Sequence, residues 1–235
     1  MAEALPKYKT DFLHASLAGG ALRFGTFELK SGRTSPYFFD AGLFYKGPLH
    51  VAIVDAFAST IQNSQELRSG GGGFDIVFGP AYKGIPLATG VVYALTKQGG
   101  SDKHPGGGGL AYTFDRKEVK DHGEGGMLVG APMEGKRVLI IDDVVSSGTA
   151  KRHAVDMIRA AGGVVAGIVV ALDRQETVPG GDGKTSALGE LRRSLGVPVV
   201  AIVKLDDIIT GMRGAVSDDD IRRIEEYRSK YGASD

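Results

Sequence analysis

The chain has 235 residues with no cysteine and no tryptophan, and its 28 basic and 28 acidic residues balance to zero formal charge. The absence of cysteine excludes a disulfide scaffold, cysteine-ligated zinc and a thiol nucleophile. Zero net charge argues against nucleic acid as the main partner. No apolar run approaches the roughly 20 residues that span a bilayer, and no signal peptide is evident. We therefore expect a cytoplasmic protein without a membrane partner.

Apolar periodicity and turn residues predict helices and strands that alternate along the chain. In chain order we expect helix 8–22, strands 23–29 and 36–40, helix 48–66, strand 75–78, helix 84–97, strands 110–114 and 137–142, helix 149–161, strand 164–172, helix 184–195, strand 198–203 and helix 217–230. Strands separated by helices indicate an α/β fold with a mostly parallel central sheet flanked by helices. Within helix 149–161, Ala154 and Ile158 are expected on the buried face and Lys151 away from it.

The segment 138–150 carries the most chemical information. An apolar strand ends in the acid pair Asp142 and Asp143, and a short loop of hydroxyls and glycine then opens a helix. Backbone N–H groups at such a helix start favour a phosphate. The two carboxylates repel phosphate but suit sugar hydroxyls, or the water shell of a magnesium ion. The chemistry indicates a ligand with a phosphate at one end and a polyhydroxyl ring at the other.

This segment resembles the phosphoribosyl-diphosphate-binding loop of type I phosphoribosyltransferases. The resemblance implies that the ligand is contacted by Asp142, Asp143, Val144, Val145, Ser146, Ser147, Gly148, Thr149 and Ala150. The same loop occurs in regulators that have lost catalysis and in transferases for purine bases, so it does not specify the acceptor.

Two further segments, 27–40 and 79–86, resemble the orotate phosphoribosyltransferase branch of this family. In the first, the resemblance places Phe38 and Phe39 against the orotate ring and Lys30 among the residues that bind phosphoribosyl diphosphate. In the second, it places Tyr82 and Lys83 on the same ligand, with Lys83 near the diphosphate.

A third segment, 112–126, contains more acidic than basic side chains, and its composition alone favours a solvated loop. Its order of residues nevertheless resembles the mobile catalytic lid of the same branch. The resemblance implies a lid over 115–126 that brings four side chains to the diphosphate: Arg116, Lys117, Lys120 and His122. Its glycines are suited to a hinge.

The fourth segment, 171–176, lies at the end of the buried strand 164–172. Asp173 and Arg174 are neighbours on a strand and point to opposite faces, so their mutual pairing is poor. The resemblance implies that Arg174 grips the orotate carboxylate, as guanidinium groups do. Ser146 stands where the family often has threonine, and its hydroxyl is expected to preserve an orotate contact.

Together these segments imply transfer of a phosphoribosyl group to orotate, giving orotidine 5′-phosphate and diphosphate in pyrimidine (UMP) biosynthesis. The catalytic residues implied are Lys83, Arg116, Lys120, Asp142 and Asp143. Mg²⁺ is expected as the cofactor, bound through phosphoribosyl diphosphate, with Asp142 and Asp143 as candidates for contact through its waters. A single domain is expected over 1–235, with about 1–45 contributing to a hood and a homodimer that shares the lid between subunits. The alternatives are a ligand-binding regulator and a transferase for another base.

Overall fold

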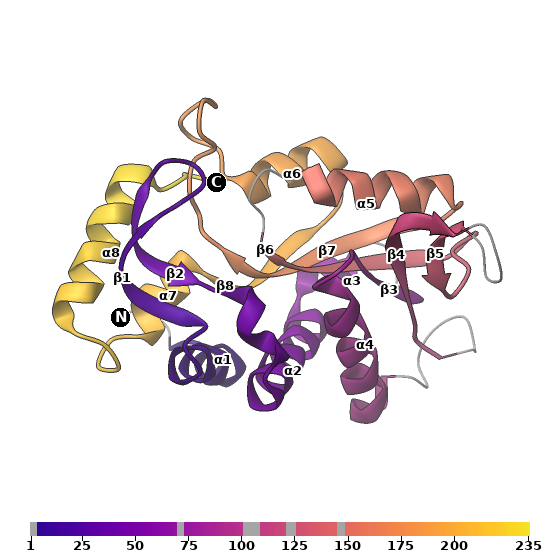
Figure 1. The fold of residues 1–235 in the computed structure, drawn as a ribbon, viewed down its shortest axis with the longest axis horizontal. Helices are drawn as coiled ribbons and strands as arrows, with labels where there is room; N and C mark the ends of the chain where they lie inside the picture. The colour runs from indigo at the N-terminus through magenta and orange to yellow at the C-terminus, as the bar shows by residue number, and fades with distance from the viewer. Residues whose placement is uncertain (1–3, 70–72, 101–108, 121–125, 145–148) are drawn as a thin grey trace.

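A six-stranded sheet forms the centre of the protein in its computed structural model (Figure 1). The structure describes residues 4–69, 73–100, 109–120, 126–144 and 149–235. The strand order is β5–β4–β3–β6–β7–β8. All neighbouring pairs run parallel except β4 with β5, so the prediction of a mostly parallel sheet is confirmed. The strands are β3 (Ile76–Gly79), β4 (Ala111–Lys120), β5 (Gly126–Gly130), β6 (Arg137–Val144), β7 (Val164–Asp173) and β8 (Val199–Lys204).

Helices cover both faces of this sheet, as α/β architecture requires. The alternation of side chains along β6 divides the core: Leu139 and Ile141 belong to one apolar cluster, and Val138 and Ile140 to the other. On the first side lie α1 (Lys7–Ala18), α2 (Gly47–Asn63) and α4 (Gly84–Leu95); on the second lie α5 (Thr149–Ala160) and α6 (Ala187–Leu195) (Figure 1).

A separate two-stranded antiparallel sheet joins β1 (Leu22–Glu28) to β2 (Thr34–Phe39). In Figure 1 this hairpin lies beside the last helix, α8 (Asp218–Tyr231). The rings of Tyr37 on β2 and Tyr227 on α8 meet edge to face, with centroids 6.5 Å apart. The contribution of residues 1–45 to a hood stays a prediction.

Several predicted boundaries were wrong for local reasons. Helix 8–22 ends at Ala18, since Gly20 adopts a positive φ of 76° and Leu22 already begins β1. Helix 48–66 is interrupted at Ser64, whose extended backbone separates α2 from α3 (Gln65–Ser69). The helices expected from 84 to 97 and from 184 onward are also shorter: α4 ends at Leu95 before a π-helical turn (Thr96–Gly100), and α6 begins at Ala187.

Strand β5 and helix α7 (Leu205–Gly211) were not predicted from the sequence. Strand β5 pairs with β4 at Thr113, Phe114, Asp115 and Lys120, and β4 itself extends to Lys120, well beyond the predicted end at 114. Helix α7 follows β8 directly, with the Asp207 carboxylate accepting the backbone N–H of Lys204 at 2.8 Å. The last helix, expected over 217–230, is capped by Ser217, whose hydroxyl accepts the backbone N–H of Asp220.

A short helical turn (Ala41–Tyr45) links β2 to α2. Among the helices in the described part of the chain, none is both long and apolar enough to cross a membrane.

Candidate active site

The candidate site lies at the carboxyl ends of β3, β6 and β7, where open α/β sheets bind ligands. These strands are neighbours and parallel, so the residues that follow them meet at one edge of the sheet. Lys83 follows β3, the acid pair ends β6, and Arg174 follows β7.

The Lys83 ammonium and the Asp143 carboxylate join two of the predicted segments. Lys83 Nζ lies 3.0 Å from Asp143 Oδ2, and the other oxygen, Oδ1, accepts the backbone N–H of Val144 at 2.7 Å. Burial would raise the pKa of Asp143, but the hydrogen bonds from Lys83 and from the Val144 N–H lower it below its usual value. The Lys83 side chain is 59% exposed, so it remains accessible to a ligand.

The other member of the acid pair, Asp142, is paired with a residue that the sequence did not single out. Lys151 Nζ lies 2.6 Å from Asp142 Oδ2 and also donates to the Val144 carbonyl at 2.5 Å. Burial raises the pKa of Asp142, with the charge of Lys151 acting in the opposite direction. Lys151 thus ties the first turn of α5 to the end of β6.

The expectation that Lys151 lies away from the buried face was wrong, since the residue is only 5% exposed. Ala154, Val155 and Ile158 are buried in the same helix, at the i+3, i+4 and i+7 positions that share a face with Lys151. A lysine within this buried pattern was the signal that could have revealed the pair.

We expect Lys151→Met to destabilise the fold, because it leaves the buried Asp142 carboxylate without its cation. Breaking a buried ion pair from one side costs about 3–5 kcal/mol. Chemical denaturation would measure the loss, and combining Lys151→Met with Asp142→Asn should restore part of it by removing the orphaned charge. A double variant no more stable than Lys151→Met would contradict this role.

The loop between β3 and α4 carries Tyr82 and Lys83 and depends on two glycines. A Cβ atom at Gly79 would lie 2.1 Å from the Gly84 carbonyl oxygen, so only glycine permits this close approach. The buried carboxylate of Asp115 accepts the Ala81 backbone N–H at 2.6 Å and anchors the loop. Sequence reasoning missed this role because it counted Asp115 among the charges of the lid. Tyr82 is 70% exposed.

The predicted lid, 115–126, falls partly within described structure. Residues up to Lys120 continue β4, and Lys120 pairs with Gly126 at the start of β5, while His122 lies outside the described residues. The Arg116 Nη1 donates to the Gly126 carbonyl at 3.4 Å, and Lys117 is exposed. The lid function of this hairpin stays a prediction.

The structure describes the predicted phosphate-binding loop, 142–150, only at its two ends. Val144 ends β6, whereas Val145, Ser146, Ser147 and Gly148 lie outside the described residues. Thr149 and Ala150 begin α5, so the backbone is placed as a helix N-terminus after the acid pair. That is the position predicted to favour a phosphate.

The three hairpin residues of the predicted site do not gather at one point. Lys30 is exposed in the turn between β1 and β2. Phe38 packs against Phe27, with ring centroids 5.5 Å apart. Phe39 packs against Phe12 at 6.2 Å. Adjacent residues of a strand alternate, so the two rings predicted to contact orotate lie on opposite faces of β2.

Arg174 is held in a cluster that joins the hairpin to the segment after β7. Its guanidinium carbon lies 4.4 Å from the Tyr37 ring centroid, and its Nη2 donates to the Ser35 hydroxyl at 3.1 Å. Its Nε donates to Glu176 Oε1 at 2.7 Å. As predicted, Arg174 does not pair with Asp173, which instead accepts the Gln175 backbone N–H at 2.8 Å.

The carboxylate oxygens of the acid pair are chemically suited to the neighbourhood of the expected magnesium ion. Mg²⁺ favours oxygen ligands and retains several waters in sites shared with phosphates. The carboxylate oxygens of Asp142 and Asp143 are engaged by Lys151, Lys83 and backbone N–H groups. A carboxylate oxygen can accept more than one hydrogen bond, so these oxygens could also accept from the waters of a ligand-bound ion.

Comparison with known proteins identifies the family. A model described as "Phosphoribosyl transferase domain" matches residues 43–182. An orotate phosphoribosyltransferase of Neurospora crassa is 56% identical, over 99% of this chain and 99% of that protein. The chain belongs to the orotate phosphoribosyltransferase family.

Bacterial members of the same family match this chain in sequence and, in one solved structure, in fold. The orotate phosphoribosyltransferase of Halorhodospira halophila is 46% identical, over 97% of this chain and 99% of that protein. The crystal structure of the orotate phosphoribosyltransferase of Francisella tularensis superposes with a TM-score of 0.79 at 36% identity, covering 94% of this chain and 99% of that one. The predicted α/β class and the resemblance stated from the sequence are thereby confirmed.

Proposed function

We propose that the protein transfers the phosphoribosyl group of 5-phosphoribosyl 1-diphosphate to orotate, giving orotidine 5′-phosphate and diphosphate for UMP synthesis. The observation that carries this proposal is the contact between Lys83 and Asp143, at 3.0 Å. It brings a candidate diphosphate ligand and a candidate ribose ligand together at the carboxyl edge of the sheet, one strand away from Arg174.

The chemistry requires charge stabilisation and no covalent nucleophile. As the bond from the anomeric carbon to the diphosphate breaks, negative charge grows on the leaving group and positive charge on the ribose. Lys83 is placed to stabilise the diphosphate, with Arg116, Lys117, Lys120 and His122 joining it when the lid closes. Mg²⁺ bound through phosphoribosyl diphosphate would add to this stabilisation. Asp142 and Asp143 would hold the ribose hydroxyls through their carboxylates.

Orotate recognition is assigned to Arg174, the Ser146 hydroxyl and the segment Phe38–Phe39, which can offer only one of its two rings to the substrate because they lie on opposite faces of β2. Lys30 is assigned to the edge of the phosphoribosyl-diphosphate site. The hydrogen bonds of Arg174 to Ser35 and Glu176 use its Nε and Nη2. Its Nη1 takes part in neither of these two contacts, and we assign it to the substrate carboxylate.

We expect Arg174→Ala to raise the KM for orotate far more than the KM for phosphoribosyl diphosphate. A charge-assisted hydrogen bond contributes about 1.5–3 kcal/mol, or roughly 10- to 150-fold. Steady-state kinetics with each substrate varied in turn would measure both constants. Equal weakening of both substrates would mean that Arg174 supports the fold and does not recognise orotate.

Assembly follows from the same proposal. We expect a homodimer in which the lid of each subunit covers the site of the other, because one short hairpin must bring several cations over a site built by distant strands. A lid that closes over its own subunit is the alternative.

Incubating the purified protein with orotate, phosphoribosyl diphosphate and Mg²⁺, and following orotate absorbance, tests the function directly. We expect orotate to be consumed only with all three present. Adenine and hypoxanthine as acceptors test the alternative of another base. Binding of phosphoribosyl diphosphate without product from any base would favour the regulator.

A further inference from the structure

Glu176 lies between two arginines that come from different parts of the chain. Its Oε1 accepts from Arg174 Nε and lies 2.7 Å from Arg174 Nη2, and its Oε2 lies 3.5 Å from Arg33 Nη1. The side chains of all three are at most 18% exposed. A carboxylate shared in this way fixes both guanidinium groups with little screening by water.

The backbone at Gln175 brings Arg174 and Glu176 to the same side. Gln175 has a φ of 49°, in the left-handed region that non-glycine residues seldom adopt. The turn is held by the Asp173 carboxylate, which accepts the Gln175 N–H, and by the Gln175 side chain, which exchanges two hydrogen bonds with Asp206. The pairing of Arg174 with Glu176 is therefore built into a braced turn.

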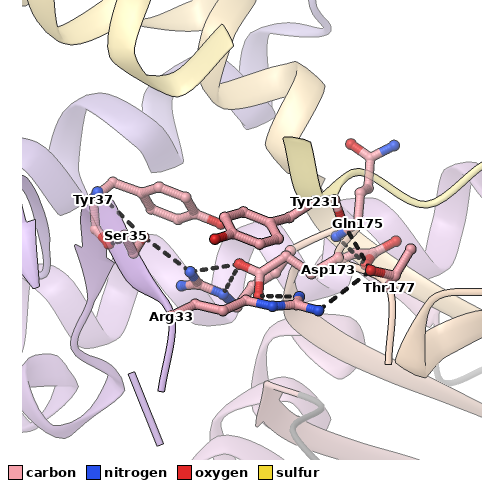
Figure 2. A network of polar contacts seen from close by, with 9 residues as sticks. Arg33, Ser35, Tyr37, Asp173, Gln175, Thr177 and Tyr231 are labelled. Atoms are coloured by element: carbon pink, nitrogen blue, oxygen red, sulfur yellow. Dashed lines mark hydrogen bonds and ion pairs between the residues drawn. The ribbon is translucent and has the colours of Figure 1, made fainter. Parts of the chain in front are cut away.

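Arg33 is braced by the C-terminal part of the chain. Its guanidinium carbon lies 4.7 Å from the Tyr231 ring centroid, and its Nη2 donates to the Thr177 hydroxyl at 3.3 Å. The backbone of Thr177 donates to the Tyr231 carbonyl at 2.9 Å. Figure 2 shows Arg33 below the Tyr231 ring and facing Thr177, so the hairpin, the segment after β7 and α8 meet at this cluster.

Glu176 is the carboxylate that the two arginines share. Asp173 and Asp206 contact Gln175 instead, and Asp206 also pairs with Arg228. Arg174 uses its Nε and Nη2 in its contacts with Glu176 and Ser35, and its Nη1 takes part in neither contact.

We propose that Glu176 is the positioning residue for Arg174 in orotate recognition, with Arg33 and Tyr231 holding Glu176 in turn. This inference rests on the proposed function. Glu176 does not touch the substrate; it fixes one side of the guanidinium so that Nη1 meets the orotate carboxylate without first losing rotamer freedom.

The test is Glu176→Gln, which keeps the shape of the side chain and removes its charge. We expect the KM for orotate and its Kd, measured by equilibrium dialysis with labelled orotate, to rise about 10-fold. The KM for phosphoribosyl diphosphate and the kcat should change by less than about twofold. Arg33→Gln, which loosens Glu176 but leaves Arg174 paired, should shift the orotate constants in the same direction by a smaller factor.

Glu190→Gln is the matched control. Glu190 on α6 pairs with Arg152 on α5 at 2.7 Å, away from the site. It should leave all constants unchanged. A fall in the orotate KM of Glu176→Gln would mean that Glu176 competes with the substrate for Arg174 and would overturn the inference. An unchanged orotate KM, or an equal rise for both substrates, would do so as well. Failure of the proposed function is separate: the wild-type protein would then form no orotidine 5′-phosphate, whatever the dialysis shows.

Discussion

Replacing Asp142 and Asp143 together with asparagine should lower kcat/KM by about two to three orders of magnitude. The physical reason is the loss of both carboxylates that would hold the ribose hydroxyls, together with the charge that positions Lys83, which lies 3.0 Å from Asp143. Initial rates measured with Mg²⁺ and saturating orotate would give the loss. Direct titration with phosphoribosyl diphosphate would show how much of it is lost binding.

The control for this variant is Asp156→Asn, which removes the charge of an exposed acid on α5, outside the site. Its rate should equal that of the wild type, and thermal denaturation should establish that both variants are folded. Full turnover of the Asp142/Asp143 variant in the presence of a chelator would refute the assignment of the acid pair.

Mixing two inactive variants should restore about a quarter of the wild-type activity if the lid acts between subunits. One partner is Lys120→Ala, altered in the lid, and the other carries both asparagine substitutions at Asp142 and Asp143. Random exchange makes about half of the dimers mixed, and twofold symmetry gives each mixed dimer one intact composite site. Activity measured after exchange of differently tagged subunits would record the recovery.

Verified subunit exchange is essential to this experiment, and co-purification through two different tags would establish it. Exchanged dimers that remain inactive would show that the lid closes over its own subunit, because no intact site could then form. A chain that elutes as a monomer at assay concentration would remove the dimer proposal altogether.

Local patterns along the chain were enough to predict much of the sheet. The apolar run 138–141 followed by Asp142 and Asp143 predicted a buried strand that ends in acids, and β6 has that form. Strand β5 escaped prediction because Gly126–Gly130 has a short and weakly apolar pattern. It becomes a strand by pairing with the extended β4, which is a tertiary contact.

The sequence predicted only those residues of the candidate site that lie in recognisable motifs. They singled out Lys83, the acid pair and Arg174, and parallel strands explained why these residues would converge. They did not identify Lys151, Asp115 or Glu176 as partners, because an isolated charged residue in a sequence carries no sign of which group it will face.

The sequence by itself determined the alternation of strands and helices and predicted the carboxyl edge of the sheet as the place of the chemistry. Those properties depend on short-range spacing of apolar, glycine and acidic residues, which one chain displays directly. Its motifs also carried the resemblance to the family. Only the tertiary structure decided that Lys151 is buried against Asp142, and that Arg33 and Arg174 share Glu176 beneath Tyr231. These pairings join residues far apart along the chain, and their geometry exists only after the hairpin, the sheet edge and the last helix have packed together.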